Sequence, residues 1–164
     1  MIRRIRNLSP TAVVMLLGAW LCTACLGGKV YDEYQELPLA GWEKVDKVAF
    51  NIPSMTTTGV YDVEMGLRTT GDYPFMNLSL IVEPQIIRSD GNQTTLSPVV
   101  MRCKLVDVHG NTHGQGINYY QYDFHVTTLQ LHTGDSLILT IHHDMKREVL
   151  PGLSDMGIRL TRRQ

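Results

Sequence analysis

Residues 61–68, Tyr-Asp-Val-Glu-Met-Gly-Leu-Arg, decide the fold class of this chain. Every odd-numbered position is apolar, from Tyr61 to Leu67, whereas Asp62, Glu64 and Arg68 occupy even-numbered positions. Successive side chains of a β-strand point to opposite faces, so this alternation predicts a strand with one face in a core and the other in solvent. It is the clearest half-buried strand in the sequence.

Further short strands are predicted on both sides of this stretch. Apolar or alternating runs occur at residues 48–52, 78–82, 99–105, 119–126, 136–142 and 156–160. Turn signals separate them: Asp90-Gly91 within residues 88–92, a glycine-rich loop at 109–116 and a turn at 132–135. Pro84 is expected to end the strand 78–82, or to place that end at a sheet edge. The one helical turn we expect lies at residues 143–149, before Pro151.

About eight short strands without a long helical period predict an all-β protein, a single antiparallel β-sandwich of jelly-roll-like form. Three segments are expected. Residues 1–24 form a lipoprotein signal peptide, residues 25–40 hold an acylated cysteine and a tether or edge strand, and residues 41–164 form the sandwich domain. Val30, Tyr31 and Tyr34 are the residues that favour an edge strand over a tether, because they could pack against the domain.

The N-terminus has the pattern of a bacterial lipoprotein. Three arginines within residues 3–6 precede an apolar stretch at residues 12–21, and Cys22-Thr23-Ala24-Cys25 follows. A basic segment, a short apolar segment and small residues before a cleavage site are typical of a secretory signal. The cysteine directly after Ala24 indicates acylation of Cys25, although Cys22 stands where leucine is usual. The alternative is an uncleaved membrane helix, because residues 7–28 carry no charge and could span a bilayer.

The residues after Cys25 indicate where the anchored protein lies. Two or more acyl chains make membrane anchoring effectively permanent. Leu26 follows the cysteine where Asp would favour retention, so we expect the outer membrane, and the missing acidic cluster favours its periplasmic face. The expected partners are therefore the membrane, through the acyl chains, and other envelope proteins.

Composition excludes one class of partner and one kind of cross-link. Without residues 1–24 the chain keeps 140 residues, with 12 Lys+Arg and 16 Asp+Glu, a balance of −4. A mildly acidic chain without a basic run is a poor candidate for nucleic-acid binding. Once Cys25 is acylated, Cys103 is the only thiol left, so no intramolecular disulfide is expected. Its alternating surroundings predict a small buried residue.

No motif in the chain indicates catalysis or a metal. His142 and His143 are adjacent, so on a strand they would point to opposite faces and could not bind one ion. Asp144 could share a face with His142, but two ligands do not make a site. His109 and His113 flank glycines in a loop, where their spacing carries no meaning. The chain has no nucleophile elbow and no phosphate-binding loop, so we expect no enzyme, no metal and no cofactor.

Four aromatic residues, Tyr73, Phe75, Tyr120 and Tyr122, are the candidate contact surface. Tyr120 and Tyr122 would share one strand face with Phe124, opposite to Tyr119. That face is either core, with the tyrosine hydroxyls at its rim, or a platform on which sugars stack. Tyr73-Pro74-Phe75 is expected at a loop tip, where it either folds back over the end of the sandwich or is exposed as a contact.

Several fragments, taken in order, resemble the GldH family of gliding-motility lipoproteins from Bacteroidetes. They are residues 30–34 (Val-Tyr-Asp-Glu-Tyr), Gly41-Trp42 with residues 46–50 (Asp-Lys-Val-Ala-Phe), residues 67–78, residues 142–147 (His-His-Asp-Met-Lys-Arg) and residues 150–159. The resemblance covers most of residues 30–160. The chain departs from it at Thr112, within a segment where the family usually carries a tryptophan, and this puts a shared contact surface in doubt there.

The resemblance implies a small envelope lipoprotein of the gliding apparatus, without recognised catalytic activity. The acylated cysteine is the only functional residue that it carries over to this chain. A non-catalytic scaffold or assembly role is therefore expected. The main alternative is a carbohydrate-binding β-sandwich lipoprotein of the cell envelope, and an envelope hydrolase or metal-dependent enzyme is a third.

Overall fold

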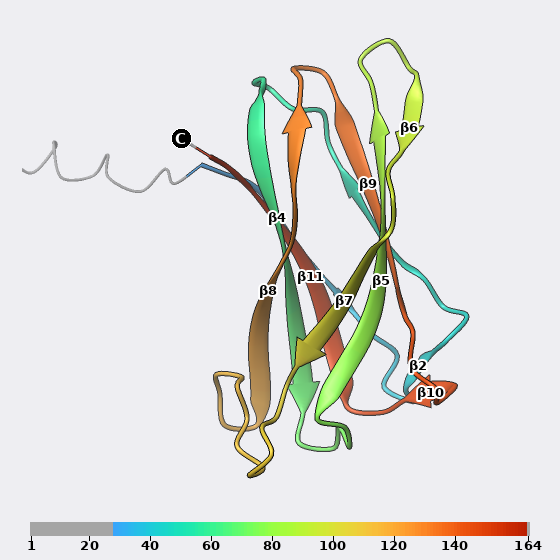
Figure 1. The fold of residues 1–164 in the computed structure, drawn as a ribbon, viewed down its shortest axis with the longest axis vertical. Helices are drawn as coiled ribbons and strands as arrows, with labels where there is room; N and C mark the ends of the chain where they lie inside the picture. The colour runs from blue at the N-terminus through green and yellow to red at the C-terminus, as the bar shows by residue number, and fades with distance from the viewer. Residues whose placement is uncertain (1–27, 164) are drawn as a thin grey trace, which may run out of the picture.

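The computed structural model describes residues 28–163, in which every regular element is a β-strand. Figure 1 shows the strands in two layers, with β4, β8 and β11 in one and β5, β7 and β9 in the other. Eleven strands lie within the described residues: β1 (Lys29–Glu36), β2 (Trp42–Glu43), β3 (Val48–Ile52), β4 (Gly59–Thr70), β5 (Asn77–Ile87), β6 (Gln93–Thr95), β7 (Val99–Lys104), β8 (Tyr119–Leu131), β9 (Ser136–His143), β10 (Val149–Leu150) and β11 (Leu153–Arg162).

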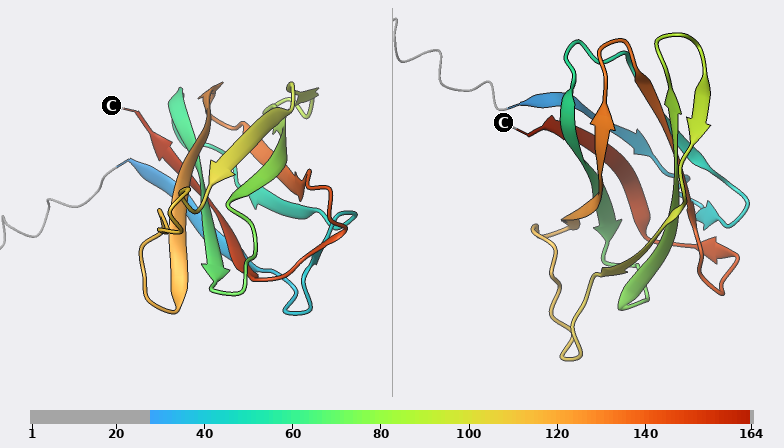
Figure 2. Two further views of the ribbon diagram at one scale, coloured as in Figure 1. Left: turned by 60° about the horizontal axis from the view of Figure 1, so that its bottom comes forward. Right: turned by 45° about the horizontal axis from the view of Figure 1, so that its top comes forward.

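The two large sheets are antiparallel throughout. The first has the strand order β1-β11-β4-β8, and the second has the order β3-β9-β5, with β6 and β7 both paired to β5. The short strands β2 and β10 pair with each other. Long strands that follow one another in the sequence alternate between the sheets, apart from the run β5–β6–β7, as the two views of Figure 2 show. The prediction of an all-β sandwich is confirmed, and its jelly-roll-like detail stays a prediction.

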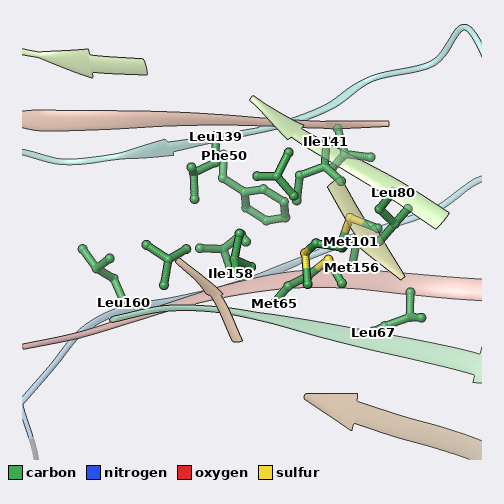
Figure 3. Close-up of a cluster of buried hydrophobic side chains, with 14 of the residues drawn as sticks. Phe50, Met65, Leu67, Leu80, Met101, Leu139, Ile141, Met156, Ile158 and Leu160 are labelled. Carbon is green, nitrogen blue, oxygen red and sulfur yellow. The ribbon is translucent and has the colours of Figure 1, made fainter. Parts of the chain in front are cut away.

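The core lies between the sheets and is organised by β4, which lies between β11 and β8. The row from Tyr61 to Leu67 is at most 1% exposed at every second residue, as the alternation predicts. Figure 3 shows Met65 and Leu67 with β11 side chains, facing Phe50, Leu80 and Leu139 of the second sheet. Full burial of one large aliphatic or aromatic side chain contributes about 1.5–3 kcal/mol. The facing rows are therefore the main source of stability.

The turn predictions are confirmed where glycine is required. Gly91 has a φ of +85° in the β5–β6 hairpin, and Gly134 has a φ of +89° in the turn between β8 and β9. Only glycine adopts this region without steric cost. The N–H of Arg88 donates to the carbonyl of Asn92 (2.8 Å), which closes the hairpin.

The prediction that Pro84 ends its strand was wrong. β5 runs through Pro84 to Ile87 in the centre of its sheet, and Pro84 pairs with Leu139 of β9. On the other side, the ladder with β7 ends at Val82 and the ladder with β6 begins at Gln85, so Pro84 lies in the gap between them. An N–H is not needed for pairing in that gap, and the proline is tolerated.

The helical turn expected at residues 143–149 is also absent. β9 continues to His143, and Val149–Leu150 pair as β10 with Trp42 and Glu43. Trp42 and Leu150 are both fully buried. Extended pairing brings these two large apolar side chains into the core together, which an exposed helical turn would not do.

The segment expected to be a tether or an edge strand forms an edge strand, β1, over Lys29–Glu36. Tyr31 is buried in the core, whereas Tyr34 lies on the outer face of the first sheet. The Gln35 side chain donates from Nε2 to the carbonyl of Ala49 in β3 (2.7 Å). This bond joins the edges of the two sheets.

The Tyr34 ring lies flat across two glycines on the outer face of the first sheet. A Cβ at Gly157 of β11 would come within 2.6 Å of the ring, and a Cβ at Gly66 of β4 would overlap its hydroxyl end. The Arg68 guanidinium stacks over the ring at 4.2 Å from its centre, and Gln121 of β8 donates from Nε2 to the Tyr34 hydroxyl (2.7 Å). One side chain from an edge strand thus spans all four strands of the sheet.

We predict that Gly157→Ala destabilises the protein by about 1–3 kcal/mol, the usual cost of overpacking. The new methyl would displace the Tyr34 ring and break its contacts with Arg68 and Gln121. Urea unfolding measures this change. Gly71→Ala is the matched control, because its Cβ would meet no atom within 4 Å. If the Gly157→Ala variant unfolds at the same urea concentration as the wild type, the packing of the Tyr34 ring does not require glycine at position 157.

Candidate functional site

The four candidate contact residues lie at one end of the sandwich. Thr70, the last residue of β4, pairs with Tyr119, the first residue of β8. Residues 71–76 and 105–118 therefore leave the sandwich at the same end, which we call the loop end and which is at the bottom of Figure 1. The structure thus brings together two segments that are far apart in the sequence, residues 71–76 and 105–118.

Tyr122 belongs to the core. It is 5% exposed, its ring stacks on Phe124 with centres 6.2 Å apart, and its hydroxyl bonds to the Thr112 hydroxyl (2.7 Å). Tyr120 is only partly buried and packs against the core from the same face of β8. Of the two interpretations of this strand face, burial in the core applies to Tyr122, whereas Tyr120 lies at the rim of the core.

Tyr73 and Phe75 fold back over the end of the sandwich. Both rings pack against the core, and they meet edge to face with centres 5.6 Å apart. The Tyr73 hydroxyl donates to the carbonyl of Asn77 (3.1 Å), and burial raises the pKa of this hydroxyl. Both side chains remain partly accessible, so each still offers an edge to a ligand.

Tyr73 and Tyr120 line a shallow hollow of about 190 Å³. Thr69, Thr70 and Thr112 add hydroxyl groups to its wall. Three of the four candidate residues, Tyr73, Tyr120 and the buried Tyr122, therefore line one concave surface. Aromatic edges beside hydroxyl groups could contact a small polar ligand or a partner side chain.

Residues 105–118 form two tight turns held by their own polar groups. The Asp107 carboxylate accepts hydrogen bonds from the backbone N–H of His109 (2.8 Å) and of Asn111 (2.9 Å), and from the Asn111 side chain (2.9 Å). These bonds, the Asn111 side chain first, hold the pKa of Asp107 below its ordinary value. Gln115 and Gln121 exchange two backbone hydrogen bonds, which close the second turn.

The tips of these turns carry exposed aliphatic residues that the sequence analysis did not single out. Val108 is 82% exposed and Ile117 is 89% exposed, and Met76 of the other segment is 43% exposed. The only signal in the sequence is an aliphatic residue inside a segment rich in glycine, asparagine and histidine. Such residues are not distinguishable from core residues until the strand boundaries are known.

The histidines do not converge. His142 and His143 lie on opposite faces of β9, and the exposed His109 lies in the loop. Among residues 28–163, no group of three or more His, Cys, Asp or Glu side chains is placed to hold a metal ion.

Cys103 is fully buried in β7, as its alternating surroundings predict. Burial raises the pKa of its thiol to about 12, which keeps it protonated and unreactive at neutral pH. The acylation site Cys25 and the signal peptide lie outside the described residues. Within the described range, no helix is long and apolar enough to cross a bilayer.

Residues 29–160 match the family described as GldH lipoprotein, which is most of the chain. The chain belongs to the GldH lipoprotein family. It is 39% identical over 69 residues to the gliding motility lipoprotein GldH of Flavobacterium johnsoniae, and this match covers 42% of the chain and 43% of that protein. It is 36% identical over 63 residues to the GldH homolog of Christiangramia forsetii, covering 38% of each. The chain thus spans less than half the length of either curated relative it matches.

Membership of the GldH lipoprotein family confirms the resemblance and identifies the chain as a lipoprotein. A crystal structure of a Sulfurospirillum deleyianum protein has a similar strand arrangement, with a TM-score of 0.46 and 11% identity, over 82% of this chain and 98% of that protein. A likeness at that level carries no functional argument. The function of this sandwich must therefore be inferred from its own surface.

We predict that His143 makes the protein less stable as the pH falls from about 7 to 5. The ring is fully buried, meets Trp42 edge to face at 5.2 Å, and burial lowers its pKa from the ordinary value of 6.5. The unfolded chain therefore binds a proton in this range before the folded chain does, which favours unfolding by up to about 1.4 kcal/mol per pH unit.

Thermal unfolding at several pH values measures this effect. His143→Phe should flatten the profile between pH 5 and 7, whereas His109→Gln, at an exposed loop position, should keep it. Equal slopes for wild type and His143→Phe would show that His143 does not carry the pH dependence.

Proposed function

We propose that this chain is a non-catalytic scaffold or assembly component of an envelope protein machine, tethered by lipid on Cys25. The observation that carries the proposal is the opposite placement of the two ends of the sandwich. Lys29, where the described chain begins, pairs with Thr161, next to Arg162, which pairs with Tyr61 at the start of β4. The loop end lies beyond Thr70, at the other end of the same strand.

The length of the strand and of the linker set the geometry of this tether. Nine residue steps separate Tyr61 from Thr70, which is roughly 30 Å at about 3.3 Å per residue. Four residue steps separate Cys25 from Lys29, which can span at most about 14 Å. Lipid on Cys25 would hold one end of the sandwich close to the bilayer and leave the loop end accessible to other proteins.

The proposed location is the outer membrane, with the sandwich facing the periplasm. Leu26 after the cysteine and the missing acidic cluster support it. The partners in this proposal are other proteins of the envelope or of the gliding machinery. Tyr73, Phe75 and Tyr120 offer accessible edges for such contacts, and Tyr122 supports them from below.

We predict that cross-linking in living cells recovers the same envelope proteins with the tagged wild-type chain in repeated purifications, and loses them with Cys25→Ala. The substitution removes the acylation site and leaves the sandwich of residues 28–163 unaltered, so the fold should be unchanged. Mass spectrometry identifies the recovered proteins, and circular dichroism checks the fold. Full complementation of a deletion strain by the unacylated Cys25→Ala form would contradict the proposal.

A carbohydrate-binding role is the second candidate, favoured by the hollow between Tyr73 and Tyr120. Its threonine hydroxyls and accessible aromatic edges suit a sugar. Under this alternative, Tyr120→Ala removes glycan binding with little loss of stability, measured on a glycan array and by thermal unfolding. Tyr122→Phe, which removes only the hydroxyl bonded to Thr112, is the control. Unchanged glycan binding by Tyr120→Ala would exclude the hollow as the sugar site.

A further inference from the structure

Four exposed apolar side chains, Met76, Val108, Ile117 and Tyr119, lie at the loop end, whereas Leu39, Val45 and Val100 are exposed in other segments of the described chain. Val108 and Ile117 are 82% and 89% exposed on adjacent turns of residues 105–118, and the exposed Tyr119 follows directly in β8. Single exposed apolar residues are normal on a protein surface, whereas exposed apolar residues grouped around one hollow are a candidate interaction site. The group therefore needs a physical reason, because its residues do not contribute to the core.

Val108 and Met76 also flank a common hollow. It measures about 260 Å³ and opens between the start of β5, the end of β7 and the first turn of residues 105–118. Val106 forms part of its apolar wall, and Lys104 and Asp107 lie on it as charged groups. A hollow with an apolar wall and charges of both signs suits a side chain of a protein partner.

The turn that presents Val108 is held by hydrogen bonds within the turn itself. Asp107 receives three hydrogen bonds from His109 and Asn111, and the N–H of Asp107 donates to the carbonyl of Asn111 (2.9 Å). The Thr112 hydroxyl bonds to Tyr122, which ties the turn to the core. A preorganised loop loses less conformational entropy on binding, so such support favours a binding role for the exposed side chain.

The position and charge of the loop end favour a protein over the anchoring membrane as its partner. The chain enters the sandwich at Lys29, roughly 30 Å away along β4 by the rise of a strand, so the lipid lies at the opposite end. Asp107, whose pKa is held below its ordinary value, places a carboxylate directly before Val108, and Lys104 lies on the same hollow. The carboxylate beside this tip opposes insertion into an anionic lipid surface.

We propose that Met76, Val108 and Ile117 form a docking surface for a protein partner that presents apolar side chains. This inference rests on the proposed function and deepens it, because it names the contacting residues and the chemistry of the partner. Val108 and Ile117 act as two anchors that enter apolar depressions of the partner, and the hollow between Met76 and Val108 accepts a partner side chain in return.

The test uses the full lipid-anchored chain in living cells, with a photo-cross-linking amino acid at position 108, 117 or 45. Val45 is the control position, because it is 78% exposed and follows β2, away from β8 in Figure 1. We expect one and the same envelope protein, identified by mass spectrometry, to be captured at positions 108 and 117 and not at 45.

The captured protein is then purified and its affinity for the chain is measured. Val108→Ser with Ile117→Ser should weaken binding at least tenfold, whereas Val45→Ser should leave it unchanged. All variants should unfold at the wild-type temperature, because the three valine and isoleucine side chains are largely exposed.

Other outcomes overturn the inference in distinguishable ways. Lipid adducts at 108 and 117 would show a membrane contact, and adducts of twice the chain mass would show a second copy of this chain. Capture of envelope proteins only at position 45 would leave the proposed function intact and would show that the docking surface lies elsewhere on the protein. No protein captured at any position, together with a fully functional Cys25→Ala form, would overturn the proposed function as well.

Discussion

The rest of the structure depends on the burial of one face of β4. This strand lies between β11 and β8, and its row from Tyr61 to Leu67 packs against the second sheet with almost no exposure. A shift of its register by one residue would move the whole row to solvent, so packing fixes the register of every strand in the first sheet. That register sets Thr70 against Tyr119 at one end and Tyr61 against Arg162 at the other. The separation of the loop end from the entry of the chain follows directly.

The loop end combines two properties that folding alone does not require. Leu105 and Val106 at the start of this segment pack into or against the core, but its two turns are held by polar groups, above all the Asp107 carboxylate, and not by burial of Val108 or Ile117. Val108 and Ile117 consequently remain in water, where exposure of apolar area costs about 25 cal/mol per Å². A partner that covers them recovers this free energy without having to order the loop first. The outer face of the first sheet is different, because Tyr34, Arg68 and Gln121 there satisfy one another.

The strands were predictable because burial on one face leaves a period of two in the sequence, as at residues 61–68 and 136–142. The glycine turns at Gly91 and Gly134 were predictable for a local reason as well. Pro84 was misjudged because its tolerance depends on a gap between two ladders, and the segment after His143 because tertiary burial of Leu150 prevails over local preference. The contact of Tyr34 with Gly66 and Gly157 joins residues far apart in the chain, so no local sequence pattern predicts it.

The same limit applies to the candidate site. Aromatic residues were recognised by type, but only the register showed that Tyr122 is core and that Tyr73 and Tyr120 share a hollow. The most direct test of the loop end as the contact surface is hydrogen–deuterium exchange of the lipid-anchored chain, alone and bound to the partner captured in cells. We expect amide protection to increase in residues 71–77 and 105–119 and to stay unchanged elsewhere. Protection gained on β1 and β11, with the loop end unaffected, would contradict this placement.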